Sequence, residues 1–247
     1  MGTTDQTVRQ TPTRAAASRS ARRRHWRRWV LAGVAVLVAL VVLVVVAVAS
    51  YIKDTPAPPA LTLPTAAASA PTGPLDGTWD VAAGSTAGFR VLESAVGVSN
   101  DTVGRTNAVT GTIGVAHGQV TAARLRVDLT TIKVAGRTQP QFATSLDTRD
   151  HPSATVTLTR PVTLSSAFTS GATITATATG QLTMAGVSRP VTLTVALRRD
   201  GAALQVAGSI PVAFSHWAIK GPQGFGFLGS LANHGVAQFR LVLGRQR

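Results

Sequence analysis

Cysteine is absent from the 247 residues of this chain, and acidic residues are few, with 10 Asp and Glu against 24 Lys and Arg. The lack of cysteine excludes disulfides, thiol nucleophiles, thiolate metal ligands and a lipid-modified cysteine. The five histidines show no pair at metal-binding spacing, so we expect no metal ion and no cofactor. Gly, Thr, Val and Ala dominate where Glu and Lys would dominate a helical protein, and this composition favours a β-rich domain.

The formal net charge of +14 is unevenly distributed along the chain. Eight arginines lie before Trp29, against a single acidic residue, Asp5. Residues 1–28 have too few apolar side chains to fold, so we expect a disordered basic tail. Basic residues near a membrane attract anionic lipid head groups, and we expect this role for the tail rather than a nucleic acid partner.

An uncharged apolar run of 21 residues follows the tail, from Trp29 to Ala49. About 20 helical residues cross a hydrocarbon core, so residues 29–52 are predicted to form a single transmembrane helix. The positive-inside rule puts the N-terminus in the cytoplasm and the rest outside, as a single-pass protein of the cell membrane. A cleaved signal peptide is the alternative, because residues 47–49 have a small-x-small pattern, although its apolar region usually has about 7 to 15 residues.

Residues 53–75 hold six of the thirteen prolines, together with Ala, Thr and Ser. This composition predicts a linker. A partly extended segment of this kind rises about 3.1 Å per residue, so we expect it to space the following domain from the bilayer.

Residues 76–247 alternate apolar and polar side chains with period two, between turns that contain glycine. In ARLRVDL, for example, Leu125, Val127 and Leu129 share one face. Roughly eight such segments predict an all-β, antiparallel domain, either a barrel or a two-sheet sandwich. Inward positions such as Ala87, Ala176 and Ala178 are small, and this favours an internal void over a filled core.

The densest charged cluster of the domain is DTRDH, which contains Asp147, Asp150 and His151. A polar loop before the next strand explains this cluster, and no nucleophile motif accompanies it. We therefore expect that the protein is not an enzyme. A lipid isomerase or hydrolase that acts through these three residues is a competing hypothesis.

Several segments resemble, in order and spacing, those of a known family. They include GTWDVAAGSTAGFRV, VGRTNAVTGTIGV and the hairpin GQLTMAGVSRPVTLTV, in which Gly186 is expected at the bend. From Gly77 to Leu243 the chain resembles the YceI-like family of secreted and periplasmic lipid-binding proteins. The resemblance implies a lipocalin-like antiparallel barrel with a polyisoprenoid or similar lipid in an elongated apolar cavity, and no catalysis.

The leading hypothesis is a membrane-anchored extracytoplasmic protein that holds an isoprenoid-type lipid as a carrier or to sequester it. Strand phase and aromatic placement predict cavity-lining residues: Phe89, Val91, Leu129, Ile132, Phe142, Leu146, Leu182, Val191, Phe214 and Trp217. Arg137 and Lys220 are candidates for contact with a lipid head group. The alternative is a non-catalytic envelope protein with a filled barrel, whose surface binds a partner or a cell-wall component.

Overall fold

The computed structural model describes residues 34, 36–44, 46–47, 50, 57–95, 98–220 and 229–246. The described residues of the predicted transmembrane helix 29–52 are helical, and its other residues, like the basic tail 1–28, lie outside the described ones. Among the residues that the structure describes, no helix combines the length and the apolar character that crossing a bilayer requires. The chain divides into two compact units, Met1–Tyr51 and Ile52–Arg247.

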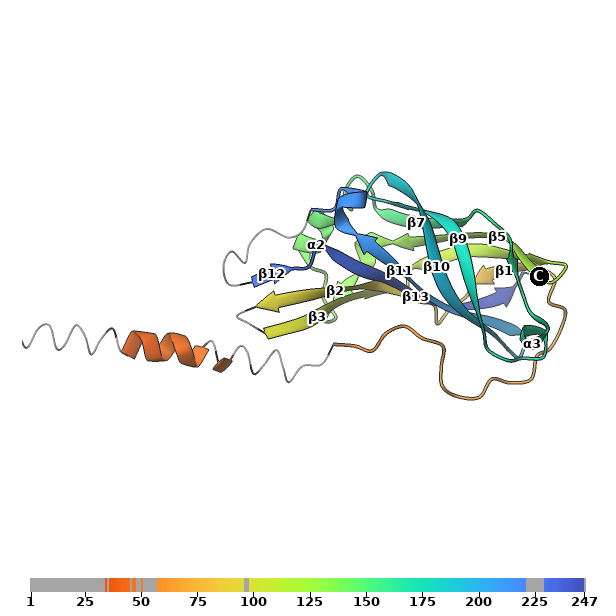
Figure 1. The fold of residues 1–247 in the computed structure, drawn as a ribbon, viewed down its shortest axis with the longest axis horizontal. Helices are drawn as coiled ribbons and strands as arrows, with labels where there is room; N and C mark the ends of the chain where they lie inside the picture. Colours follow the sequence, from red (N-terminus) through yellow and green to blue (C-terminus); the bar gives the residue numbers. More distant parts are fainter. Residues whose placement is uncertain are drawn as a thin grey trace, which may run out of the picture. The chain divides into compact units, whose positions relative to one another are not determined.

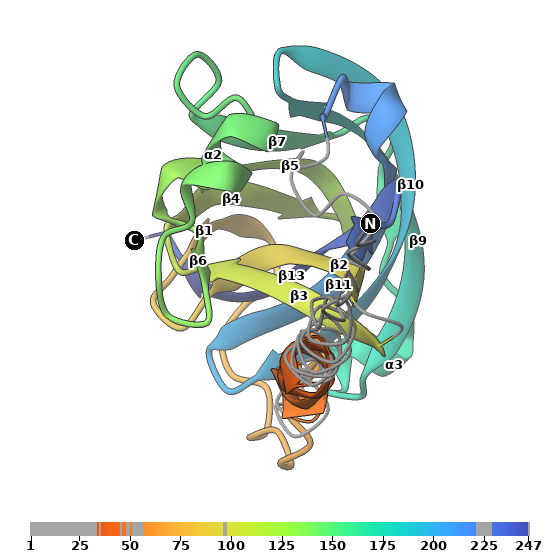
Figure 2. The same ribbon diagram turned by 90° about the vertical axis from the view of Figure 1, so that its left-hand side faces the viewer.

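Eight antiparallel strands of the second unit close into a barrel, which Figure 1 shows from the side and Figure 2 from the end where α2 lies. In ring order they are β1 (Gly77–Val81), β4 (Val109–Ala116), β5 (Gln119–Asp128), β7 (Ser153–Leu158), β9 (Ile174–Met184), β10 (Val187–Asp200), β11 (Ala203–Ala213) and β13 (His234–Arg245). Pairing of β13 with β1 closes the ring. The predicted all-β antiparallel barrel of about eight strands is confirmed.

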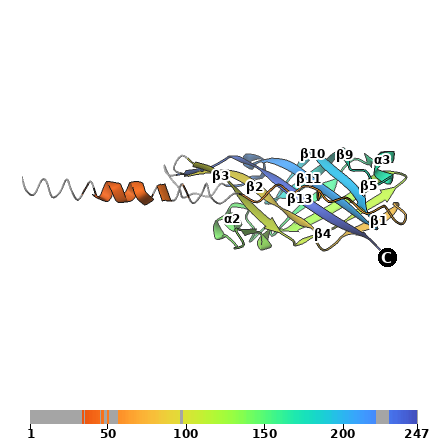
Figure 3. The same cartoon turned by 90° about the horizontal axis from the view of Figure 1, so that it is seen from below.

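Further strands extend the sheet at one end of the barrel. They are β2 (Thr86–Ala95), β3 (Val98–Thr106), β6 (Lys133–Val134) and β12 (Gly229–Leu231), while β8 (Val162–Thr163) pairs with β5. The first part of β13 pairs with β2 and its last part pairs with β1, so β2 continues the position of β1 beside β13 (Figure 3). At the break between them, the buried Ser85 hydroxyl accepts from the Val242 amide at 3.0 Å and so maintains the contact with β13.

Short helices cover the two ends of the barrel. α2 (Pro140–Ser145) and α3 (Ser166–Thr169) lie at opposite ends (Figure 1). Two 3-10 helices, η1 (Leu129–Thr131) and η2 (Phe214–Trp217), follow β5 and β11 directly. The Asp128 carboxylate caps η1 by accepting from the Thr130 amide at 2.9 Å.

The β9–β10 hairpin shows why period two in the sequence produced this barrel. Ala178, Leu182 and Met184 of β9 are buried, while Thr175 and Thr177 of the same strand are exposed. The turn consists of Ala185 (φ 48°) and Gly186 (φ 74°). Two positive φ values in a two-residue loop are those of a type I′ turn, so the predicted bend extends over both residues.

The barrel wall is incomplete between β10 and β11. β10 pairs with β9 from Val187 to Leu197, but it pairs with β11 only from Thr194 onward. η2 covers the gap: the Arg189 Nε donates to the His216 carbonyl at 2.5 Å, and the Trp217 Nε1 donates to the Leu182 carbonyl at 3.5 Å. This end of the barrel is therefore closed in part by side chains instead of a backbone ladder.

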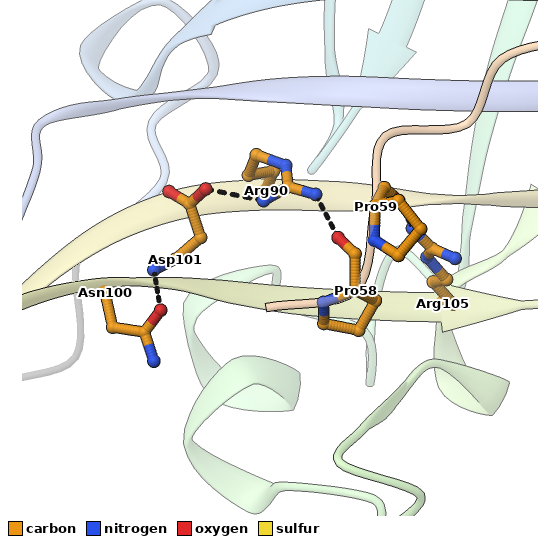
Figure 4. A network of polar contacts seen from close by, with 6 residues as sticks. All are labelled: Pro58, Pro59, Arg90, Asn100, Asp101 and Arg105. Atoms are coloured by element: carbon orange, nitrogen blue, oxygen red, sulfur yellow. Dashed lines mark hydrogen bonds and ion pairs between the residues drawn. The ribbon is translucent and has the colours of Figure 1, made fainter. Parts of the chain in front are cut away.

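The described part of the predicted linker lies along the outside of the barrel, and we call residues 57–74 the strap. Arg90 donates to the Pro58 carbonyl and Arg105 to the Pro59 carbonyl (Figure 4). Arg90 is also paired with Asp101 at 2.5 Å. Burial, and then repulsion from Arg90 and Arg240, lowers the pKa of Arg105, so this arginine is not a freely solvated charge.

The second half of the strap is held in the same way. Arg198 donates to the Ala66 carbonyl at 2.9 Å, and Arg199 donates to the Thr72 and Gly73 carbonyls at 2.9 and 2.8 Å. Both arginines are buried. Proline-rich extended chain makes no internal hydrogen bonds, so its carbonyls are free to accept from these guanidinium groups. Residues 57–74 thus follow the barrel surface.

Candidate functional site

Among the described residues, the inside of the barrel contains two neighbouring apolar cavities, and the larger of these has a volume of 140 Å³. Its wall combines inward side chains of β2, β5, β7, β9, β11 and β13 with Phe142 and Leu146 from α2 and the residue after it. Among the described residues that line it, Ser145 and Gln238 are the only ones with polar side chains. A cavity with such a wall can hold an apolar molecule but offers almost no partner to a polar one.

A second cavity of 80 Å³ lies deeper in the barrel. Phe168 of α3 is among its lining residues, whereas Phe142 of α2 lines the first cavity, so the two cavities follow one another from the α2 end to the α3 end. Four residues line both cavities: Leu125, Val156, Phe239 and Leu241. We call these four residues the waist.

Small side chains on the inner face explain why this space is empty. Ala87 lines the first cavity and Ala178 lines the second, as their inward phase predicted, and Gly180 also lines the second. At Gly180 an added Cβ would approach the Thr157 carbonyl oxygen to 2.7 Å, so the close approach of β9 to β7 requires glycine there. Ala176, the other small inward residue, packs against the core without lining either cavity.

Aromatic side chains attach α2 to the barrel. The rings of Phe89 on β2 and Phe142 on α2 have centroids 5.2 Å apart and planes tilted by 47°. This geometry is favourable for an aromatic pair, and both rings line the larger cavity. α2 is therefore both a cover and a part of the apolar wall.

Eight of the ten residues predicted to line a cavity lie on the wall of the larger one. The two exceptions are Val191, which is half-buried against the core, and Trp217. Trp217 of η2 is buried, and its Nε1 donates to the Leu182 carbonyl of β9. Contact of the eight residues with a ligand stays a prediction.

The two head-group candidates lie outside the cavities. Lys220 is exposed and directly follows Ile219, which lines the larger cavity. Arg137 is exposed in the turn after β6, where its backbone pairs with that of Val134. It precedes Thr138, which lines a small pocket of 30 Å³ beside α2.

The charged loop DTRDH does not reach the apolar interior. Asp147 Oδ2 and His151 Nε2 are 3.8 Å apart, and both side chains are about half exposed. The His151 ring lies against the β9–β10 turn, since a Cβ at Gly186 would be 2.7 Å from its Nε2. In the described part of the chain, no three His, Cys, Asp or Glu side chains are grouped in a way that could hold a metal ion.

The second cavity and its closure by Phe168 were not predicted from the sequence. Leu193 and Val195, two positions apart on β10, and Leu243 on β13 line this cavity, as period two along a strand allows. Phe168, in contrast, lies on a helix of four residues between strands, where no period-two pattern marks its direction.

Comparison with known proteins found matches in one family and in solved structures. A family model described as YceI-like domain matches residues 79–239. A polyisoprenoid binding domain from Saccharophagus degradans, implicated in plant cell wall breakdown, has 16% sequence identity and a TM-score of 0.53, covering 69% of this chain and 99% of its own. BcnA of Burkholderia cenocepacia has 16% identity and a TM-score of 0.48, covering 63% of this chain and 95% of its own. No curated protein matches the sequence.

Proposed function

Since the chain belongs to the YceI-like family, we propose that it is a membrane-anchored, extracytoplasmic lipid-binding protein whose barrel holds an isoprenoid-type amphiphile. The observation that carries this proposal is the apolar interior, with cavities of 140 and 80 Å³ in sequence along the barrel. Burial of apolar area contributes about 25 cal/mol per Å², so the chain of the ligand supplies the affinity. The fold shared with a domain described as polyisoprenoid binding supports this class of ligand.

The polar head of such a ligand remains outside the barrel. Ser145 and Gln238 are the polar residues among those that line the larger cavity in the described part of the chain, and both are uncharged. Lys220 is the better placed of the two head-group candidates, because it adjoins a residue of the cavity wall. Carriage or sequestration of the lipid follows from such binding, without a chemical step.

The cavities count against the alternative of a filled barrel that acts only through its surface. An isomerase or hydrolase that uses Asp147, Asp150 and His151 has less support. The Asp147 and His151 side chains are about half exposed, and none of the three lines either cavity.

The lipid-binding proposal is tested by mass spectrometry of lipids that leave the gently purified full chain on denaturation. We expect an isoprenoid-type lipid, and we expect Ala154→Leu, which places a larger side chain into the first cavity, to reduce its amount. Thr175→Leu, on the exposed face of β9, is the matched control and should retain the lipid. No co-purifying lipid, together with no uptake of added isoprenoid, would refute the proposal.

Membrane anchoring rests on the uncharged run from Trp29 to Ala49 and on the eight arginines before it. Alkaline carbonate should leave the full chain in the membrane pellet, and protease added to spheroplasts should digest the barrel domain. Release by carbonate would contradict the anchor, and protection of the domain would contradict the proposed orientation.

A further inference from the structure

The two cavities together extend from α2 at one end to Phe168 of α3 at the other. The larger one is adjacent to α2 and the smaller one extends to Phe168, whose side chain is 1% exposed. α3 holds Phe168 in place through hydrogen bonds from the Phe168 amide to the Ser165 carbonyl at 3.0 Å and from the Gly171 amide to the Phe168 carbonyl at 3.1 Å. Phe168 therefore lines the deeper cavity at its α3 end.

The strap supports this stop from outside. A Cβ on Gly171 would lie 2.9 Å from Cγ of Pro71, so the strap packs directly on the turn that follows α3. The strap is held there by the Thr72 amide, which donates to the Gly201 carbonyl at 2.9 Å, and by the Gly201 amide, which donates to the Ser69 carbonyl at 3.1 Å. Outward movement of α3 thus requires displacement of the strap.

The volume limits how much of a chain fits. A cavity of about 150 Å³ lined by aliphatic and aromatic side chains accepts one benzene, which has six carbons. On the same scale, the cavities of 140 and 80 Å³ together hold about nine carbon atoms. This number corresponds to about two five-carbon isoprene units.

We propose that this barrel selects its ligand by chain length, burying about two isoprene units and stopping the chain at Phe168. This inference rests on the proposed lipid-binding function and specifies its ligand. The chain enters with its apolar end first, because Thr179 is the only polar residue among the described ones that line the deeper cavity. Any further units of a longer isoprenoid stay outside the barrel, toward α2.

Prenyl alcohols of 5, 10, 15 and 20 carbons are the probes, with the full chain in lipid nanodiscs and Kd measured by native mass spectrometry. Each methylene that becomes buried improves binding about fourfold. We expect a Kd that falls on the order of a hundredfold or more from C5 to C10 and by less than about tenfold over the two further units. An equally steep improvement up to C20 would overturn the proposed limit.

Ala178→Leu tests the role of the deeper cavity, because Ala178 is on its wall and leucine would occupy most of its 80 Å³. We expect weaker binding of the C10 alcohol, on the order of a hundredfold, with little change for C5. Phe168→Ala should have the opposite effect and let the C15 alcohol gain over C10. Thr175→Leu, exposed on the same strand as Ala178, should leave the series unchanged.

The outcomes separate the two proposals. If wild-type protein binds the alcohols but Ala178→Leu binds C10 as tightly as wild type does, the chain-length stop is wrong and lipid binding stands. If wild-type protein binds none of the four alcohols, the proposed function itself fails. Should Phe168→Ala not fold, the comparison of Ala178→Leu with Thr175→Leu still decides the inference.

Discussion

Replacement of Leu182 by alanine should lower the free energy of unfolding of the barrel by about 4 kcal/mol. Leu182 is on β9, is 3% exposed and lines the larger cavity. The substitution removes three buried carbon groups, worth about 2.4 kcal/mol in transfer free energy. It also enlarges the cavity by roughly 75 Å³, which adds about 1.8 kcal/mol at about 24 cal/mol per Å³.

The assay is urea denaturation of the full chain in mild detergent, followed by the fluorescence of the buried Trp79 and Trp217. The control is Thr177→Ala, an exposed residue of the same strand, which should change the unfolding free energy by less than about 0.5 kcal/mol. A saturating isoprenoid alcohol, at about 100 times its Kd, should raise wild-type stability by about 2.7 kcal/mol.

The result that would refute this reasoning is a loss below about 1 kcal/mol, or one equal to that of Thr177→Ala. Leu182 would then not be packed in the wall, and the inward phase assigned to β9 would be wrong. If Leu182→Ala lowers the unfolding free energy by the expected amount but the alcohol does not stabilise the wild-type protein, the fold is supported and the proposed ligand class is contradicted.

The other predictions concern a turn, the strap and one close backbone approach. Ala185→Asn should stabilise the protein by about 0.5–1 kcal/mol, because asparagine tolerates the positive φ of 48° better than alanine does; a lower Tm would contradict this. Arg199→Lys should cost about 1.5–3 kcal/mol and accelerate amide exchange at Gly201, because the lysine Nζ is one bond closer to the backbone than the Arg199 Nη2, which donates to both the Thr72 and the Gly73 carbonyl. The exposed Arg126→Lys is the control, and equal effects of the two substitutions would refute the role of the strap. Gly88→Ala should prevent normal β2–β3 pairing and lower the Tm, since its Cβ would lie 1.9 Å from the Gly104 carbonyl oxygen. Gly114→Ala is the control and should be tolerated, because the nearest atom to its Cβ is 3.5 Å away. Equal Tm values for these two glycine variants would contradict the β2–β3 register.

Strand phase predicted much of the cavity wall because a β-strand directs alternate side chains to opposite faces. Val127 and Leu182 could be placed inside from local sequence alone, and both line the larger cavity. Trp217 could not, because its position depends on where the pairing of β10 with β11 begins at Thr194. The alternation of apolar and polar residues in a strand does not show over which residues it pairs with its neighbour.

The strap shows a second limit of local sequence. Its proline-rich composition predicts a linker, whereas the side chains that donate hydrogen bonds to it come from strands remote in the sequence. Arg198 and Ala66, for example, are 132 positions apart in the chain. Whether such a segment is a free spacer or is attached to a domain depends on which donors the fold brings to that surface.

By itself, the sequence determined the class of fold and the apolar character of the interior, because period two and the choice of small inward residues are local properties of each strand. The tertiary structure alone decided the closure of the ring by β1 and β13, the attachment of the strap, and the two volumes of 140 and 80 Å³ that end at Phe168. A volume is what remains when distant side chains have packed, so it depends on how all the strands are arranged around one axis.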